Sequence, residues 1–187
     1  MEDFVVGGQD RKLSDQEQFE QIDWYFQAHY PVKDLEDWLA RLPDRLTHAA
    51  MMQLGSAADH EMPGVLYSAG ITMSEHELGT VFTPSQPNTR TAVASWGRPA
   101  GPATENYWFP LVAAAAQLSG TTILATNQVA AAKSFSDTAW GLSEGCPAVE
   151  DAGFDNYLLT RPNGDWIQTP AAARAEIQAV AEFLRGN

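Results

Sequence analysis

Two His-Glu pairs are the first residues in this 187-residue chain whose types suggest chemistry. His60-Glu61 and His76-Glu77 stand on either side of an apolar run. A zinc site needs three or four ligands, and ligand pairs on a helix are spaced i, i+4. The two ends of an extended strand of about nine residues lie roughly 30 Å apart. We therefore expect charged strand ends here, with no metal and no cofactor.

Ser68 and Cys146 are the candidate nucleophiles. A G-x-S-x-G elbow needs glycine two positions before the serine, and Leu66 occupies that position before Ser68. Cys146 is the single cysteine, so no intrachain disulfide forms, and no local signature pairs it with a histidine. Neither a P-loop nor a dinucleotide fingerprint occurs. We expect no catalytic residue; a small hydrolase or transferase with an unrecognised His/Glu or Cys/His site is the alternative.

The charge balance favours one kind of partner. Twenty-four acidic and eleven basic residues give a net charge of −13. This field repels nucleic acid and anionic membranes and speeds encounter with basic proteins. The N-terminus lacks a basic segment followed by an apolar one, and the longest apolar run, Leu111 to Ala116, is too short to span a bilayer. We expect a cytoplasmic protein that binds a protein partner, and neither nucleic acid nor membrane.

The elements that would position these residues fall into two parts. An N-terminal helical part covers about residues 14–42, and Ser14 with Glu17 forms the capping-box signature at its start. From Gly64 onward, short β-branched and aromatic runs alternate with longer apolar segments. The predicted elements there are strands over 64–72, 78–83 and 89–96, a helix over 105–119 capped by Thr104, a strand over 121–126, a loop-rich segment over 140–156, a hairpin of 157–160 with 165–169, and a last helix from Pro170.

This order predicts one α+β domain over residues 1–187. We expect a mainly antiparallel sheet with helices covering one face. The periodicity places nine residues in the core: Phe26, Leu39, Leu66, Phe109, Val112, Leu124, Leu158, Ile177 and Leu184.

Residues 64–180 resemble the bacterial branch of the suppressor of fused domain. Ala69-Gly70-Ile71-Thr72 is similar to a strand end of that domain, and Trp108 to Leu111 to the start of its helix. Thr169-Pro170 with Glu176 is similar to its closing segment, whereas the usual glycine-histidine turn is replaced by "TNQVA". The resemblance implies a non-enzymatic immunity protein that neutralises a cognate toxin, such as a basic toxin domain. An accessory protein of a phage or secretion system is a third hypothesis.

The partner-binding residues of such a protein are expected in two acidic connections, "TMSEHELG" and "SEGCPAVEDAGFD". Loops on a rigid scaffold are where binding residues concentrate, although solvated acidic loops need no function. The predicted contact residues are Glu75, Glu77, Glu144, Glu150, Asp151 and Asp155.

Overall fold

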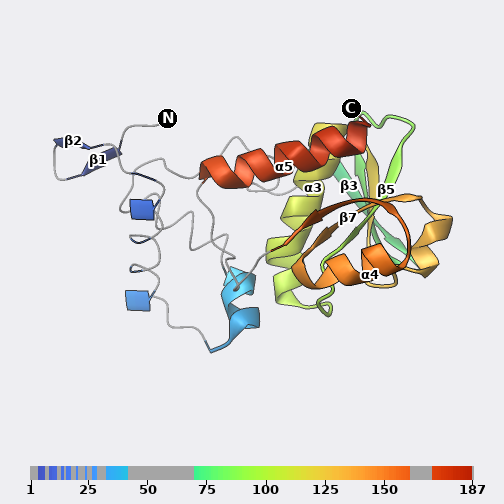
Figure 1. Cartoon of the computed structure of the whole chain (residues 1–187), viewed down its shortest axis with the longest axis horizontal. Coiled ribbons are helices and arrows are strands. Elements are labelled where there is room, and N and C mark those ends of the chain that lie inside the picture. The colour runs from blue at the N-terminus through green and yellow to red at the C-terminus, as the bar shows by residue number, and fades with distance from the viewer. Residues whose placement is uncertain are drawn as a thin grey trace.

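A computed structural model describes residues 70–160 and 170–186 without a break, together with 33–41 and shorter pieces of the first 28 residues (Figure 1). The pieces are 4–6, 9–11, 14, 16–17, 20, 24 and 27–28. The strands are β1 (Phe4–Val6), β2 (Gln9–Arg11), β3 (Ile71–His76), β4 (Gly79–Pro84), β5 (Thr91–Ser95), β6 (Thr122–Ala125), β7 (Thr138–Leu142) and β8 (Asp155–Leu159). The helices are α3 (Phe109–Ser119), α4 (Cys146–Asp151) and α5 (Pro170–Arg185), with shorter turns η1 (Thr104–Trp108), η2 (Ala131–Ser134) and η3 (Ser143–Gly145).

The main sheet has six strands in the order β3-β4-β6-β5-β7-β8. β4 is antiparallel to both of its neighbours, whereas β6, β5, β7 and β8 all run parallel. The α+β prediction is confirmed, and the sheet is mixed. The parallel half arises because a helix or a helical turn separates each of these strands from the next along the chain.

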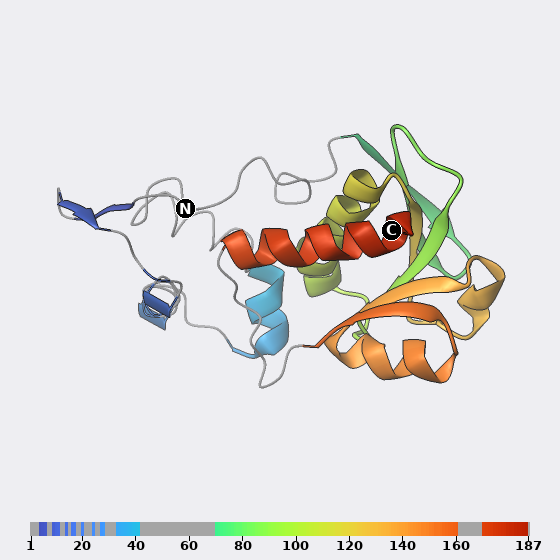
Figure 2. The same cartoon turned by 45° about the horizontal axis from the view of Figure 1, so that its top comes forward.

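Alternate residues of the central strands point to two different layers. On β5, Ala92 and Ala94 join the cluster that includes residues of α3 and α5, while Val93 joins the opposite cluster, with Val149 of α4. Figure 2 shows α5 crossing α3 on one side of the sheet and α4 on the other side. Helices therefore cover both faces, which corrects the expectation that they cover only one.

Helix α3 forms the centre of the larger cluster. Its run Val112 to Ala116 is buried, and the small alanines allow it to lie close to the sheet. Gly120 ends the helix in the left-handed conformation, with a φ of 73°. Thr104 lies inside the preceding turn η1, and its hydroxyl donates to the Pro99 carbonyl, so the prediction that it caps the helix is wrong.

Several predicted elements and core residues are confirmed. The capping box forms as expected, since the N–H of Ser14 donates to the Glu17 carboxylate and the N–H of Glu17 donates to the Ser14 hydroxyl. A helix covers residues 35–41, and its Leu39 is fully buried. Of the other predicted core residues, Val112, Leu124, Ile177 and Leu184 are buried, while Phe109 and Leu158 are half-buried.

The predicted loops contain regular structure. The segment 140–156 holds the end of β7 and all of α4, and β3 runs through the first acidic connection. β7 resembles a loop in sequence because it is short and contains Gly141, a residue typical of turns. It forms a strand because its pairing with β5 and β8 on both sides compensates for the low strand propensity of Gly141. Phe26, Leu66, Ser68, His60 and the second strand of the predicted hairpin lie outside the described residues.

Candidate active site at a serine elbow

The chain turns sharply from strand to helix at Ser143. β7 ends at Leu142, and α4 begins at Cys146 after the single turn η3. Ser143 has a φ of 51°, and within the described residues it is the one non-glycine residue with a positive φ. A side chain in this left-handed region is uncommon and costs free energy, and such strain is concentrated at functional sites.

Glycines on both sides of Ser143 allow two backbone segments to touch. A Cβ on Gly145 would overlap the Ser95 carbonyl at the end of β5. A Cβ on Gly141 would lie 3.3 Å from the same carbonyl oxygen. The spacing Gly141-Leu142-Ser143-Glu144-Gly145 is G-x-S-x-G, with a steric clash for any side chain at Gly145 and a tight contact at Gly141.

The loop that follows β5 lies against this elbow. Gly97 has a φ of 74°, and a Cβ there would overlap the Glu144 carbonyl. Arg98 comes next and precedes Pro99, and a residue before proline favours extended backbone. No acceptor for the Arg98 N–H is found in the part of the chain that the structure describes. The N–H of Glu144 lies in the first turn after β7, where helical N–H groups have no intrahelical acceptor.

The Arg98 side chain holds this loop to the elbow and to the N-terminal helix. Its Nη1 lies 3.2 Å from both carboxylate oxygens of Glu144. Its Nη2 lies 3.2 Å from Oε2 of Glu36, on the helix of residues 35–41. The guanidinium carbon also stands 5.9 Å from the centre of the Trp96 ring. The Asn127 side chain, just after β6, donates to the Arg98 carbonyl.

Buried polar atoms without a partner gather in these two segments. Five such side-chain atoms occur in the described residues, and four belong to β5 with its loop or to β7 with the elbow. They are Ser95 Oγ, Arg98 Nε, Trp140 Nε1 and Ser143 Oγ. A buried hydroxyl without a partner loses its bonds to water without compensation, so each needs a functional or structural reason. The Ser143 hydroxyl is therefore buried and makes no hydrogen bond within the described residues.

Cys146, directly after the elbow, has a structural role. Its thiol is buried and donates to the Leu159 carbonyl oxygen at 3.6 Å. Burial, with the nearby Glu150 carboxylate as the second cause, raises the pKa of the Cys146 thiol above its usual value. The thiolate is the nucleophilic form, so a raised pKa makes Cys146 a poor nucleophile.

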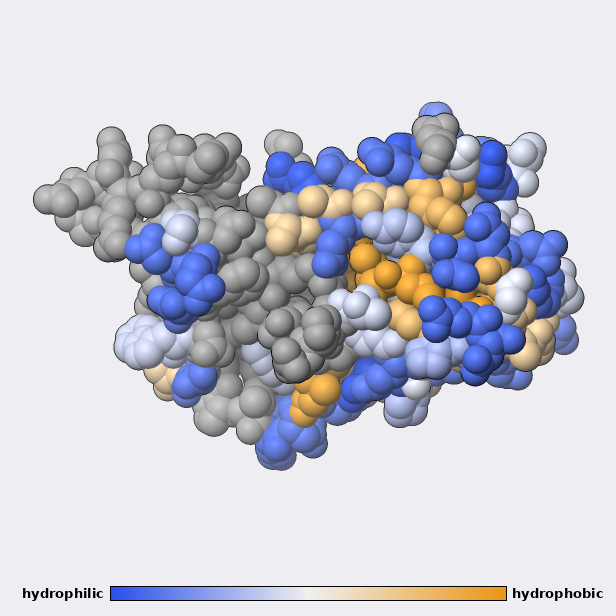
Figure 3. Space-filling model, viewed as in Figure 1, coloured by the Kyte–Doolittle hydropathy of each residue, from blue (hydrophilic) through white to orange (hydrophobic). Residues whose placement is uncertain are grey.

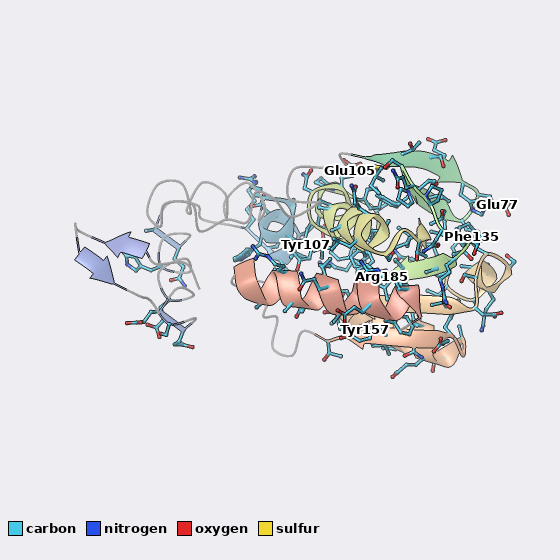
Figure 4. The ribbon with its side chains drawn as sticks, turned by 90° about the horizontal axis from the view of Figure 1, so that it is seen from above. Glu77, Glu105, Tyr107, Phe135, Tyr157 and Arg185 are labelled. Atoms are coloured by element: carbon cyan, nitrogen blue, oxygen red, sulfur yellow. The ribbon has the colours of Figure 1, made fainter. Side chains whose placement is uncertain are left out.

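His76 is on β3, an edge strand of the sheet that lies far from β7 and the elbow. Its Nδ1 accepts a hydrogen bond from the Leu78 N–H, and its ring packs edge-on against Phe135. Figure 4 places Glu77 and Phe135 at the end of the sheet far from the helix of residues 35–41, beside which Tyr107 lies. β3 and β7 are four strands apart, or roughly 19 Å at the usual strand spacing, so His76 does not reach Ser143.

The six predicted contact residues are all exposed but do not come from one loop. Glu75 is on β3 and Asp155 begins β8, and these strands form the two opposite edges of the sheet. Glu77 lies in the turn after β3, while Glu150 and Asp151 end α4. Glu144 is in the elbow and pairs with Arg98. Within the described residues, no group of three metal-ligating side chains is placed to hold an ion.

The residues that sequence reasoning missed are Ser143 and its two glycines. The G-x-S-x-G spacing of residues 141–145 is visible in the sequence and is the signal that points to this site. The strand before them is hard to recognise because "TAWGL" has neither a β-branched run nor a clear alternation, and such a segment is typical of a loop. The role of Ser95 and Gly97 depends on contacts between β5 and β7, which no local pattern shows.

Comparison with protein-family models, curated proteins and solved structures gives no match. None of the described helices is long and apolar enough to cross a membrane.

Proposed function

We propose that the chain is a serine hydrolase that transfers acyl groups through Ser143. The observation that carries this proposal is a strained serine at the centre of G-x-S-x-G in a strand-to-helix turn. This combination is the nucleophile elbow of α/β-hydrolases. In that fold the N–H after the nucleophile and an N–H from the loop after the third strand form the oxyanion hole. Here β5 is the third strand of the main sheet in chain order, and its loop contacts Glu144.

The proposed reaction proceeds through an acyl-enzyme. Ser143 Oγ attacks the carbonyl carbon of an ester and gives its proton to a base, while the carbonyl π electrons move to the oxygen. The N–H groups of Glu144 and Arg98 stabilise this oxyanion. The intermediate collapses, the ester C–O bond breaks, and the alcohol leaves with the proton from the base. Water then attacks the acyl-enzyme in the same way, which releases the acid and restores the Ser143 hydroxyl.

Histidine is the commonest general base, and His76 is the histidine within the described residues. His76 is too far from Ser143, and His29, His48 and His60 are the remaining histidines of the chain. This proposal belongs to the hydrolase class that was the alternative in the sequence analysis, but it uses a serine in place of the His/Glu or Cys/His site.

Hydrolysis of p-nitrophenyl acetate tests the proposal. We expect release of p-nitrophenolate with a first-turnover burst equal to the enzyme concentration, and loss of that burst in Ser143→Ala. Ser134→Ala is the matched control, because Ser134 is an exposed serine whose hydroxyl bonds only to a neighbouring carbonyl. Equal burst amplitudes in both variants would contradict a role for Ser143.

The toxin-neutralising function and the suppressor of fused resemblance stay as predictions beside this proposal. The exposure of all six acidic contact residues is compatible with a basic partner.

A further inference from the structure

The two residues that would form the oxyanion hole are joined through their own side chains. The Arg98 guanidinium contacts both carboxylate oxygens of Glu144, so the ion pair closes a ring that includes both backbone segments. The backbones already touch at Gly97, where only a glycine fits against the Glu144 carbonyl. The separation of the two N–H groups therefore depends on a contact that Arg98 itself makes.

Arg98 is also the point where four parts of the chain meet. Glu144 comes from the end of β7, Asn127 from the end of β6, and Glu36 from the N-terminal helix. The Arg98 side chain is only 14% exposed, whereas those of Glu36 and Glu144 are 37% and 55% exposed. Exposed ion pairs add little to stability, so this arrangement is better explained by what it holds in place than by the stability it adds.

We infer that Arg98 is a positioning residue that sets the oxyanion hole by clamping Glu144 and anchoring the β5 loop to residues 35–41. This inference rests on the proposed acyl transfer at Ser143. Arginine suits the task because its planar fork addresses two carboxylates at once, which a lysine ammonium at the end of a flexible chain does not do. The N-terminal helix thereby becomes part of the catalytic unit through Glu36.

The test is the kinetics of inactivation by a fluorophosphonate, measured in the full chain. For Arg98→Gln we expect the inactivation rate constant to fall roughly 10- to 100-fold, as for a misplaced catalytic group, while the probe's initial binding constant stays unchanged. Arg98→Lys should recover only part of the rate. Glu144→Gln and Glu36→Gln each remove one arm of the clamp and should each give part of the loss.

Arg41→Gln is the matched control, since Arg41 pairs with Asp37 on the same N-terminal helix without touching the elbow. Its inactivation rate should equal that of the wild type. If the probe inactivates the wild type and inactivates Arg98→Gln equally fast, the positioning role is overturned and the proposed function stands. Failure of the wild type itself to react would overturn the proposed function. If Arg98→Gln does not fold, the two glutamine variants at Glu36 and Glu144 decide the question.

Discussion

Ser143 combines backbone strain with a buried hydroxyl that has no partner within the described residues, and a serine in an ordinary turn needs neither. Its neighbours explain how the strain is maintained. Gly145 and Gly97 let the elbow and the β5 loop touch backbone to backbone, so the chain has little freedom to relax at Ser143. Strain of this kind costs about 1–3 kcal/mol per residue and persists only where the surroundings determine the conformation.

Gly145→Ala is the residue-scale prediction for the elbow. The added Cβ overlaps the Ser95 carbonyl, and because backbone cannot rotate away, β5 and the elbow must separate. We expect a loss of about 1–3 kcal/mol in the free energy of unfolding, measured by urea titration, together with loss of fluorophosphonate labelling. Gly153→Ala is the control for labelling, because its positive φ of 68° strains an alanine but nothing lies within 4 Å of its Cβ position, so the site should keep its shape. Labelling at the wild-type rate in Gly145→Ala would show that this contact does not shape the site.

Cys146 gives a second residue-scale prediction, on pH. Its pKa is raised by burial, so the folded state holds its proton in a range where the unfolded chain releases it. The stabilisation is fully present below the ordinary pKa of 9.0 and is lost as pH rises through the folded pKa. Urea titrations at pH 8 and pH 10 should show a larger loss for the wild type than for Cys146→Ala, which lacks the thiol. Equal losses would mean that burial does not perturb this thiol.

At the scale of elements, the ends of the parallel strands form the site. β5, β6 and β7 end in Ser95, Ala125 and Leu142, and the residues that follow them meet at Arg98 and the elbow. Ligand sites in open sheets lie outside the carboxyl ends of parallel strands, where the chain continues to opposite sides. The chain continues from β5 to β6 on one side, and from β7 to β8 on the other side. The switch point therefore lies between the neighbouring strands β5 and β7.

Thr126 tests how the end of β6 is held. Its buried hydroxyl donates to the Leu78 carbonyl and accepts from the Gln128 N–H. Thr126→Val keeps the shape but leaves both backbone groups unsatisfied, so we expect a loss of about 1–3 kcal/mol in unfolding free energy. Thr160→Val, at an exposed position, should change it by less than about 0.5 kcal/mol. An unfolding free energy unchanged in Thr126→Val would contradict this role of Thr126 in holding β6 to the turn between β3 and β4.

How far the sequence predicts these elements depends on where their signals lie. The capping box at Ser14 and the helix end at Gly120 are local signals, and both are correct. β7 is stabilised by its neighbours on both sides and has no local signal, so it was missed together with the serine that follows it. The parallel pairing was missed for the same reason, because strand direction depends on how the helices cross the sheet.

At the scale of the whole molecule, the surface has a hydrophilic part and a smaller apolar part. Figure 3 shows that the described residues on this face are largely hydrophilic, with an apolar group below α5 where β8 runs. Half-buried Tyr157 of β8 packs on Phe183 of α5 there, with ring centres 5.7 Å apart. The acidic residues predicted from the sequence are at the surface, as their composition indicates, but the topology distributes them between opposite edges of the sheet. The sequence therefore predicts that these acidic residues are exposed, but it does not predict which of them lie close together.

Charge reversal tests the electrostatic part of the partner prediction. Changing Glu75, Glu77, Glu150, Asp151 and Asp155 to lysine moves the net charge from −13 to −3 and leaves the Arg98–Glu144 pair intact. We expect slower association with a basic probe protein, cytochrome c, most clearly at low salt, because steering depends on the summed field. The thermal midpoint should change little. Unaltered association rates at low salt would place any basic partner's contact elsewhere.

The central claim is that Ser143 is an activated nucleophile, and intact-mass analysis of the full chain after treatment with a fluorophosphonate tests it most directly. This probe phosphonylates activated serines and needs no knowledge of the natural ester. We expect one adduct per chain, located at Ser143 by peptide mapping, absent from Ser143→Ala, and retained in Ser134→Ala and His76→Ala. An unmodified chain, or an adduct on another residue, would contradict it.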